Sequence, residues 1–110
     1  MTITERHENG ITIFDIDGRV DSEGAVDLDL ALQTAVSEEK YKLVLNMQNV
    51  RYINSSGLRT LADILTQSKE NDGDLKLAAL DPKVKRVLEI VGFDNFFAIH
   101  ASTEEAIASF

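Results

Sequence analysis

Apolar residues recur at intervals of three and four positions in several stretches of the chain, and this spacing predicts amphipathic helices. The first helical face consists of Ala25, Leu28, Leu32, Ala35 and Val36, widened by Val26 and Leu30. The second consists of Leu58, Leu61, Ala62 and Leu65. The third consists of Val84, Val87, Leu88 and Val91. A last, shorter helix carries Ala106, Ile107 and Phe110.

Between these stretches lie shorter apolar runs that predict strands. Residues 2–7 and 10–17 read as a hairpin, because Asn9-Gly10 is a strong signal for a two-residue turn. Residues 41–47 contain the continuously apolar run Leu43-Val44-Leu45, which is expected when helices cover both faces of a strand. Residues 74–80 form a further core strand, and the segment around Phe96, Phe97 and Ile99 forms a short edge strand.

Polar residues mark the ends of these elements. Asp17-Gly18 ends the second strand, and Asp21 or Ser22 caps the helix that follows. Residues 46–49 turn the chain after the third strand, and a helix begins after Ser56. Asp81-Pro82 starts the third helix, Gly92 ends it, and Ser102 caps the last helix.

The order of the elements predicts the fold class. Strands and helices alternate from residue 10 onward, which favours an α/β fold with a parallel core and right-handed crossovers. The initial hairpin makes the sheet mixed, and about four helices accompany it. A chain of 110 residues is expected to form one domain, here residues 1–110.

Composition narrows the chemistry. Nineteen acidic and 11 basic residues give a net charge of −8, so nucleic acid and anionic membranes are poor partners. Cysteine is absent, which removes disulfides and thiol catalysis. The only histidines, His7 and His100, have no metal-ligand spacing, so we expect no metal and no cofactor. Neither a signal-peptide pattern nor a long apolar run occurs, and we expect a cytoplasmic protein.

The stretch Asn54-Ser55-Ser56-Gly57 is the most unusual local feature. It has two compatible interpretations. It is a helix cap, or it is a phosphorylation site at a helix N-terminus, which stabilises the two negative charges of a phosphate. One serine suffices for a cap, so the second serine and the glycine indicate a further role. The catalytic motifs G-x-S-x-G, G-x-x-x-x-G-K and G-x-G-x-x-G are all absent. We therefore expect a protein without enzymatic activity.

Residues 43–58 resemble the signature of the STAS domain, the family of bacterial anti-sigma factor antagonists. The family pattern is an apolar strand, a short loop with an aromatic residue, and D-S-S/T-G-L. Residues 17–21 are similar to the G-x-x-D of the family, and residues 81–93 resemble its third helix. The resemblance covers nearly the whole chain. It departs from the pattern at Asn54, where Asp is common, although Asn also caps helices.

The resemblance implies a function. In the family, the first serine of the pair is phosphorylated by a kinase that is itself the anti-sigma factor, and this residue is Ser55 here. The implied partners are this serine kinase and a phosphatase, and the chain is expected to be a monomer or weak dimer. The expected partner-binding residues are Gly18, Asp21, Asn54, Ser55, Ser56, Gly57 and Leu58.

Two other functions stay open. The chain could be a STAS module that binds a protein without being phosphorylated, as a scaffold or as an accessory subunit of a transport system. An enzyme with Ser55 as nucleophile is a remote alternative, because no base lies near it in the sequence. Asp21 is expected to lie close to Ser55, since loops at the same end of parallel strands meet there. Its replacement by Ala is expected to change partner affinity without changing stability.

Overall fold

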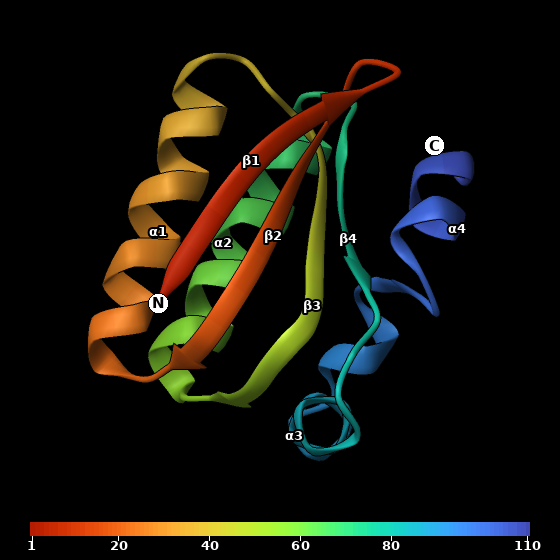
Figure 1. The fold of residues 1–110 in the computed structure, drawn as a ribbon. Coiled ribbons are helices and arrows are strands. Elements are labelled where there is room, and N and C mark those ends of the chain that lie inside the picture. Colours follow the sequence, from red (N-terminus) through yellow and green to blue (C-terminus); the bar gives the residue numbers. More distant parts are fainter.

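A five-stranded sheet in the spatial order β1-β2-β3-β4-β5 forms the centre of the computed structural model, which describes residues 1–110 (Figure 1). The strands are β1 (Thr2–Glu8), β2 (Ile11–Val20), β3 (Lys42–Ile53), β4 (Asp74–Ala78) and β5 (Ala98–His100). Strands β1 and β2 are antiparallel, and all other neighbours are parallel. Asn9 and Gly10 join the hairpin with φ values of 54° and 78°, as a type I′ turn requires. The predicted mixed sheet is confirmed.

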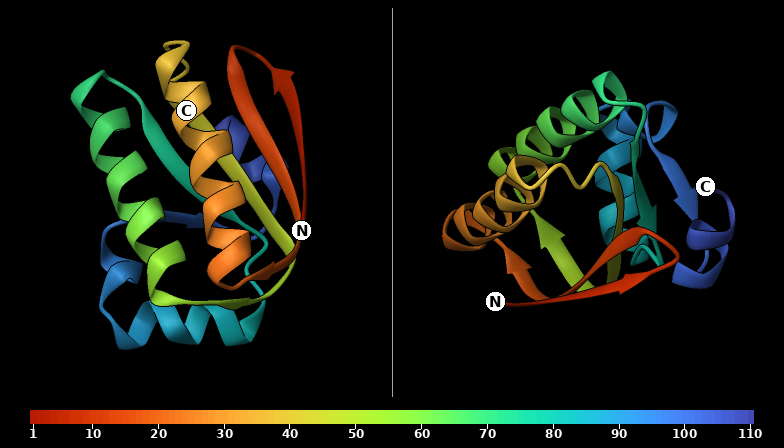
Figure 2. Two further views of the ribbon diagram at one scale, coloured as in Figure 1. Left: turned by 90° about the vertical axis from the view of Figure 1, so that its left-hand side faces the viewer. Right: turned by 90° about the horizontal axis from the view of Figure 1, so that it is seen from above.

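The helices are α1 (Ser22–Ser37), α2 (Ser55–Glu70), α3 (Pro82–Ile90) and α4 (Thr103–Ala108), with a 3₁₀ turn, η1 (Phe93–Asn95), before β5. Helices α1 and α2 lie side by side on one face of the sheet, and α4 lies on the other (Figure 2). Right-handed crossovers that all step in the same direction across a sheet place their helices on the same face. The connections through α1 and α2 are of this kind, whereas α4 follows the last strand and folds back.

The two faces of the sheet carry cores of unequal size. The face below α1 and α2 belongs to a cluster of 21 buried residues, and the face below α4 to a cluster of six. Leu43 and Leu45 point into the larger cluster, and Val44 between them points into the smaller one. The run Leu43-Val44-Leu45 is therefore covered on both faces, as its sequence predicts.

Two strands are longer than the sequence suggests. Strand β2 continues through Asp17-Gly18 to Val20, and β3 continues through the expected turn at 46–49 to Ile53. The polar residues of this part of β3 are tolerated because several of them are solvent-exposed, while Met47, Val50 and Ile53 stay buried. Parallel pairing persists to the partners Val20 and Ile53, with irregular register at two points.

Other expected boundaries shift by one to three residues. Helix α2 begins at Ser55 rather than after Ser56, and β4 ends at Ala78. Strand β5 begins at Ala98, so Phe96 and Phe97 precede it. The expected apolar face of α1 is too wide, because the side chains of Val26 and Leu30 are 67% and 68% exposed. Only the narrower stripe with Leu28 and Leu32 at its centre meets the sheet.

Candidate functional site

The ends of β2 and β3 place the starts of α1 and α2 next to each other. The backbone amide of Asn54 donates to the carbonyl oxygen of Val20 at 2.9 Å, which ties the two strand-to-helix turns together. A β-carbon on Gly57 would lie only 2.5 Å from Cγ1 of Val20 and 2.9 Å from Cγ1 of Ile53. Glycine at this position therefore lets α2 begin directly against the two strands.

Both helices are capped by the residue that precedes them. The Asn54 side-chain oxygen Oδ1 accepts from the Gly57 amide at 2.9 Å, and Oδ1 of Asp21 accepts from the Gly24 amide at 2.9 Å. Asp21 is thus the cap of α1, and its loss is expected to lower stability as well as affinity. This corrects the expectation that its replacement would leave stability unchanged.

Ser55 and Ser56 are the first two residues of α2, and both are exposed. Since Asn54 is the cap, neither serine is needed for that purpose. The hydroxyl of Ser55 makes no hydrogen bond within the chain, so it is available to an incoming group. The first turn of α2 contains no acidic residue. The positive end of this helix is therefore not neutralised by the chain itself.

The predicted site residues fall into three sets. Asp21, Asn54, Ser55 and Ser56 come together where the two helices begin, as expected from their positions at the strand ends. Gly57 and Leu58 are buried, and they position α2. Gly18 lies in β2 with a φ of 135°, a conformation that favours glycine, at the irregular register before Val20.

Three of the five arginines of this acidic chain lie close in sequence to the site. The guanidinium of Arg19 stacks over the ring of Tyr52 at 4.3 Å, and Arg51 Nε lies 3.8 Å from Oδ2 of Asp81. Arg59, one turn after Ser55 on α2, has no ion-pair partner. The site therefore includes a free guanidinium beside exposed hydroxyls.

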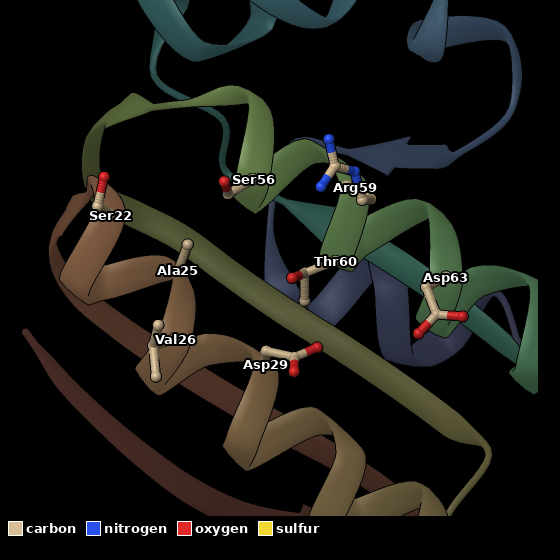
Figure 3. A pocket seen from close by; sticks show the side chains of 8 residues that line it. All are labelled: Ser22, Ala25, Val26, Asp29, Ser56, Arg59, Thr60 and Asp63. Atoms are coloured by element: carbon tan, nitrogen blue, oxygen red, sulfur yellow. The ribbon is translucent and has the colours of Figure 1, made fainter.

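A groove of about 530 Å³ runs from this end of the molecule between α1 and α2 (Figure 3). Helix α1 contributes Ser22, Ala25, Val26 and Asp29 to its walls. Helix α2 contributes Ser56, Arg59, Thr60 and Asp63. The Asp63 carboxylate accepts from the side-chain amides of Gln33 and Gln67, at 2.9 and 3.1 Å. Sequence reasoning missed Ser22, Arg59 and Thr60 as residues of the site. The shared pattern of Asp21-Ser22-Glu23-Gly24 and Asn54-Ser55-Ser56-Gly57 is a signal for Ser22 alone, and no sequence signal marks Arg59 or Thr60.

The face of the sheet on which α4 lies carries a polar cluster of a different kind, formed by Arg6, Asp15 and Asn46. Arg6 Nε donates to Oδ2 of Asp15 at 2.8 Å, and Asn46 Nδ2 donates to Oδ1 of Asp15 at 2.8 Å. The hydrogen bond from Arg6 is the main cause that lowers the pKa of Asp15, and the same bond raises the pKa of Arg6. These groups satisfy one another, so the cluster offers little to a ligand.

Two general features bear on the chemistry of the molecule. None of the helices combines the length and the hydropathy that are needed to cross a membrane. No group of three or more His, Asp or Glu side chains is arranged to hold a metal ion.

Comparison with known proteins identifies similar molecules. The family model of the STAS domain matches residues 2–106. BtrV of Bordetella bronchiseptica, assigned as an anti-sigma factor antagonist, is 34% identical over 110 residues, covering 100% of this chain and 95% of BtrV. These matches agree with the resemblance found in the sequence. The role named for BtrV is regulatory and not enzymatic.

Solved structures share the fold. The crystal structure of a protein from Thermotoga maritima, also assigned as an anti-sigma factor antagonist, has a TM-score of 0.92 at 20% identity, covering 97% of this chain and 92% of that one. The Bacillus cell fate determinant SpoIIAA in its phosphorylated form has a TM-score of 0.77 at 16% identity, covering 98% of both chains.

Proposed function

This chain belongs to the STAS domain family of anti-sigma factor antagonists, and from that premise we propose that it is switched by phosphorylation of Ser55. Without phosphate, the surface around Ser55 binds an anti-sigma factor that is a serine kinase, and the sigma factor is released. The kinase ends the binding by phosphorylating Ser55, and a phosphatase restores it. The observation that carries this proposal is the exposed Ser55 hydroxyl at the start of α2, with the capping role taken by Asn54.

The chain itself tolerates a phosphate at this position. A phosphoserine adds about −1.5 to −2 charges and three acceptor oxygens. The start of a helix favours an anion by about 0.3–1 kcal/mol, and α2 has no acid of its own in its first turn. The domain therefore stays folded in both states, and the switch acts at the interface with the partner.

At a packed interface the same phosphate is unfavourable. It must lose its water or meet a carboxylate of the partner, and breaking a desolvated contact costs about 2–5 kcal/mol. This free energy corresponds to a loss of affinity of roughly 30-fold to several-thousand-fold. Among the proposed partner-binding residues, Asp21, Asn54, Ser55 and Ser56 contact the partner, and Gly18, Gly57 and Leu58 shape the backbone that presents them.

The setting of this activity follows from the proposed partner. An anti-sigma factor acts on transcription, so we place the chain in the cytoplasm, as a monomer or weak dimer. The family's usual Asp at position 54 would help to present the serine hydroxyl to the kinase, and Asn54 lacks that carboxylate. This absence favours one second candidate: a STAS module that binds a partner without being phosphorylated.

Mapping of the modified residue tests the switch. The wild type, Ser55→Ala and Ser56→Ala are each incubated with the candidate kinase and ATP, and modified peptides are identified by mass spectrometry. Modification of the wild type and of Ser56→Ala, but not of Ser55→Ala, is expected. Modification of Ser56 alone would refute the assignment, and binding without any modification would favour the second candidate.

Partner binding is measured by calorimetric titration with Ser55→Asp. The aspartate carries one charge, so we expect weaker binding than wild type but stronger binding than for the phosphorylated chain. Glu105→Ala is the matched control, because Glu105 is an exposed acid on α4, on the opposite face of the sheet. If Ser55→Asp binds as tightly as wild type while Glu105→Ala does not, the interface lies elsewhere.

A further inference from the structure

Helix α1 carries apolar side chains on its solvent side as well as on the side that faces the sheet. Val26 and Leu30 are four positions apart, so they lie on one side of the helix, and about two-thirds of each is exposed. Glu23 and Asp27 are exposed on the same side, and the whole helix contains no lysine or arginine. These four residues form what we call the acidic apolar surface.

A second exposed apolar surface carries the opposite charge. Helix α3 is the only helix with more basic than acidic residues, which are Lys83, Lys85 and Arg86 against Glu89. The spacing of Lys83, Arg86 and Ile90 places them on one exposed side of this helix. Ile90 is 71% exposed, and Phe96, after η1, is 63% exposed. The basic apolar surface consists of Lys83, Arg86, Ile90, Val91 and Phe96.

A hollow beside Phe96 gives the basic apolar surface a place for an anchoring side chain. It has a volume of about 240 Å³, and it is lined by Ala62, Leu65, Thr66, Phe93, Phe96 and Phe97. The rings of Phe93 and Phe96 meet edge to face, with their centroids 6.2 Å apart. Apolar anchors at protein interfaces fill hollows of this kind.

Neither surface is completed within the chain. No ion pair in the chain involves the charged residues of the two surfaces, Glu23, Asp27, Lys83 and Arg86. Helix α1 borders α2 on one side, and η1 borders it on the other, so the two surfaces lie apart (Figure 2). They can therefore meet only between two molecules.

The charges select one arrangement of two molecules. Two acidic apolar surfaces would bring carboxylates together, two basic ones would bring cations together, and both pairings are unfavourable. An acidic apolar surface against a basic one pairs opposite charges and removes apolar side chains of both copies from water.

We propose that the chain binds a second copy of itself head to tail, with the acidic apolar surface of one copy on the basic apolar surface of the next. Val26 and Leu30 pack against Ile90 and Phe96, and one of them enters the hollow. Such a contact leaves one surface of each kind free in a dimer, so larger assemblies form as the concentration rises. The net charge of −8 opposes this association and keeps it weak. The proposal does not depend on phosphorylation of Ser55.

Sedimentation velocity of the full chain over a range of concentrations tests the association. For wild type, we expect the average sedimentation coefficient to rise with concentration past the value of a dimer. Leu30→Ser changes one surface and Phe96→Ser the other, and each should weaken the association by about tenfold, the effect of one buried apolar side chain. Thermal unfolding checks that both variants fold, and Val26→Ser with Ile90→Ser provides a second pair.

Mixing the two variants separates the head-to-tail contact from a symmetric one. Leu30→Ser keeps an intact basic apolar surface, and Phe96→Ser keeps an intact acidic one. At a concentration where neither variant associates alone, the mixture should form a dimer with one copy of each and should not grow further. With ¹⁵N-labelled Leu30→Ser and unlabelled Phe96→Ser, we expect amide shifts at Ile90 and Val91 but not at Val26.

Two charge variants distinguish local charge from net charge. Asp27→Lys and Glu105→Lys change the net charge equally, and Glu105 is an exposed acid on α4, outside both surfaces. Lower net charge alone would strengthen the association in both variants. We expect Asp27→Lys to weaken it, because the new lysine faces the cations of the other copy, whereas Glu105→Lys should leave it unchanged or strengthen it.

Three results would overturn the proposal. The first is a wild type that stays monomeric at every concentration. The second is a plateau at the dimer without recovery in the mixture, which would mean a symmetric contact. The third is an equal effect of Asp27→Lys and Glu105→Lys. Each of them leaves the phosphorylation of Ser55 standing, and failure of that phosphorylation leaves the sedimentation result standing.

Discussion

The starts of α1 and α2 have the same local construction and different charge. Each follows a parallel strand, each is capped by a side-chain oxygen that accepts from the amide of a glycine three positions later, and each has an exposed serine after the cap. Helix α1, however, has the carboxylates of Asp21 and Glu23 at its start. Helix α2 has the neutral Asn54, no acid in its first turn, and Arg59 one turn farther on.

Both helix starts are capped, and the difference in charge decides which of them favours an added anion. The positive end of a helix favours negative charge by about 0.3–1 kcal/mol, and α1 already supplies that charge. At the start of α2 no side chain supplies a negative charge, so this preference can stabilise a phosphate that is added to Ser55. The neutral cap Asn54, which departs from the family pattern, therefore makes the surroundings of Ser55 more favourable to an anion than those of Ser22.

The glycines of the two starts provide the largest expected effects. A β-carbon on Gly24 would lie 2.2 Å from the carbonyl oxygen of Arg19, whereas one on Gly57 would meet side-chain carbons of Val20 and Ile53 at 2.5 and 2.9 Å. Side chains yield more readily than backbone. We expect Gly24→Ala to lower the free energy of unfolding by about 3 kcal/mol or more, and Gly57→Ala by about 1–2 kcal/mol. Urea unfolding of both variants tests the ranking. The reverse order would mean that the two helices do not pack against the strand ends as the glycine contacts indicate.

The caps provide effects of intermediate size. Replacing a capping Asp or Asn by Ala costs about 0.5–2 kcal/mol, and we expect Asp21→Ala to cost more than Asn54→Ala because it also removes a charge that favours the helix end. Thermal unfolding at low and high salt distinguishes the contribution of the capping hydrogen bond from that of the charge at the helix end. The difference between the variants should shrink at high salt, and a difference independent of salt would contradict the electrostatic explanation.

An added negative charge should have different effects on stability at the two serines. Ser55→Asp places a carboxylate at a start without acids, and we expect it to raise stability by about 0.3–1 kcal/mol. Ser22→Asp places one beside Asp21 and Glu23, and repulsion should cancel or reverse the same gain. Urea unfolding at low salt measures both. Equal gains in the two variants would show that the two helix starts are electrostatically equivalent.

The polar cluster of Arg6, Asp15 and Asn46 is expected to give the smallest effect. Arg6 lowers the pKa of Asp15 below its ordinary value of 3.8, so the pair contributes stability above that pH and loses it as the pH falls through the lowered value. Because the pair is partly exposed, we expect a contribution of about 0.2–1 kcal/mol. Unfolding curves between neutral and acid pH should converge for wild type and Asp15→Asn at the acid end. Parallel curves would mean that the pair contributes nothing.

Much of the fold could be predicted from the sequence. The spacing of Leu58, Leu61 and Leu65 predicts the buried stripe of α2, and all three are buried. The Asn9-Gly10 turn and the caps at Asp81 and Ser102 occur where their residue types predict them. These features are local, because turn dihedrals and capping bonds join residues that are within a few positions of each other.

Other features were decided by contacts between distant segments. Polar residues after Asn46 suggest a turn, but β3 continues to Ile53 because it pairs with β2 and exposes several of those residues. Val26 and Leu30 fit a helical apolar face, yet no other element covers them.

The candidate site likewise has a part that the local sequence determines and a part that contacts between distant segments decide. The sequence alone determined the serine turn, its cap and the helix that follows, because all of these are built from consecutive residues. Only the tertiary structure decided that Ser22, Arg59 and Thr60 line one groove, because α1 and α2 are brought together by right-handed crossovers onto one face of the sheet. Helical periodicity tells which side of a helix is buried, but it does not tell which residues of another helix lie opposite.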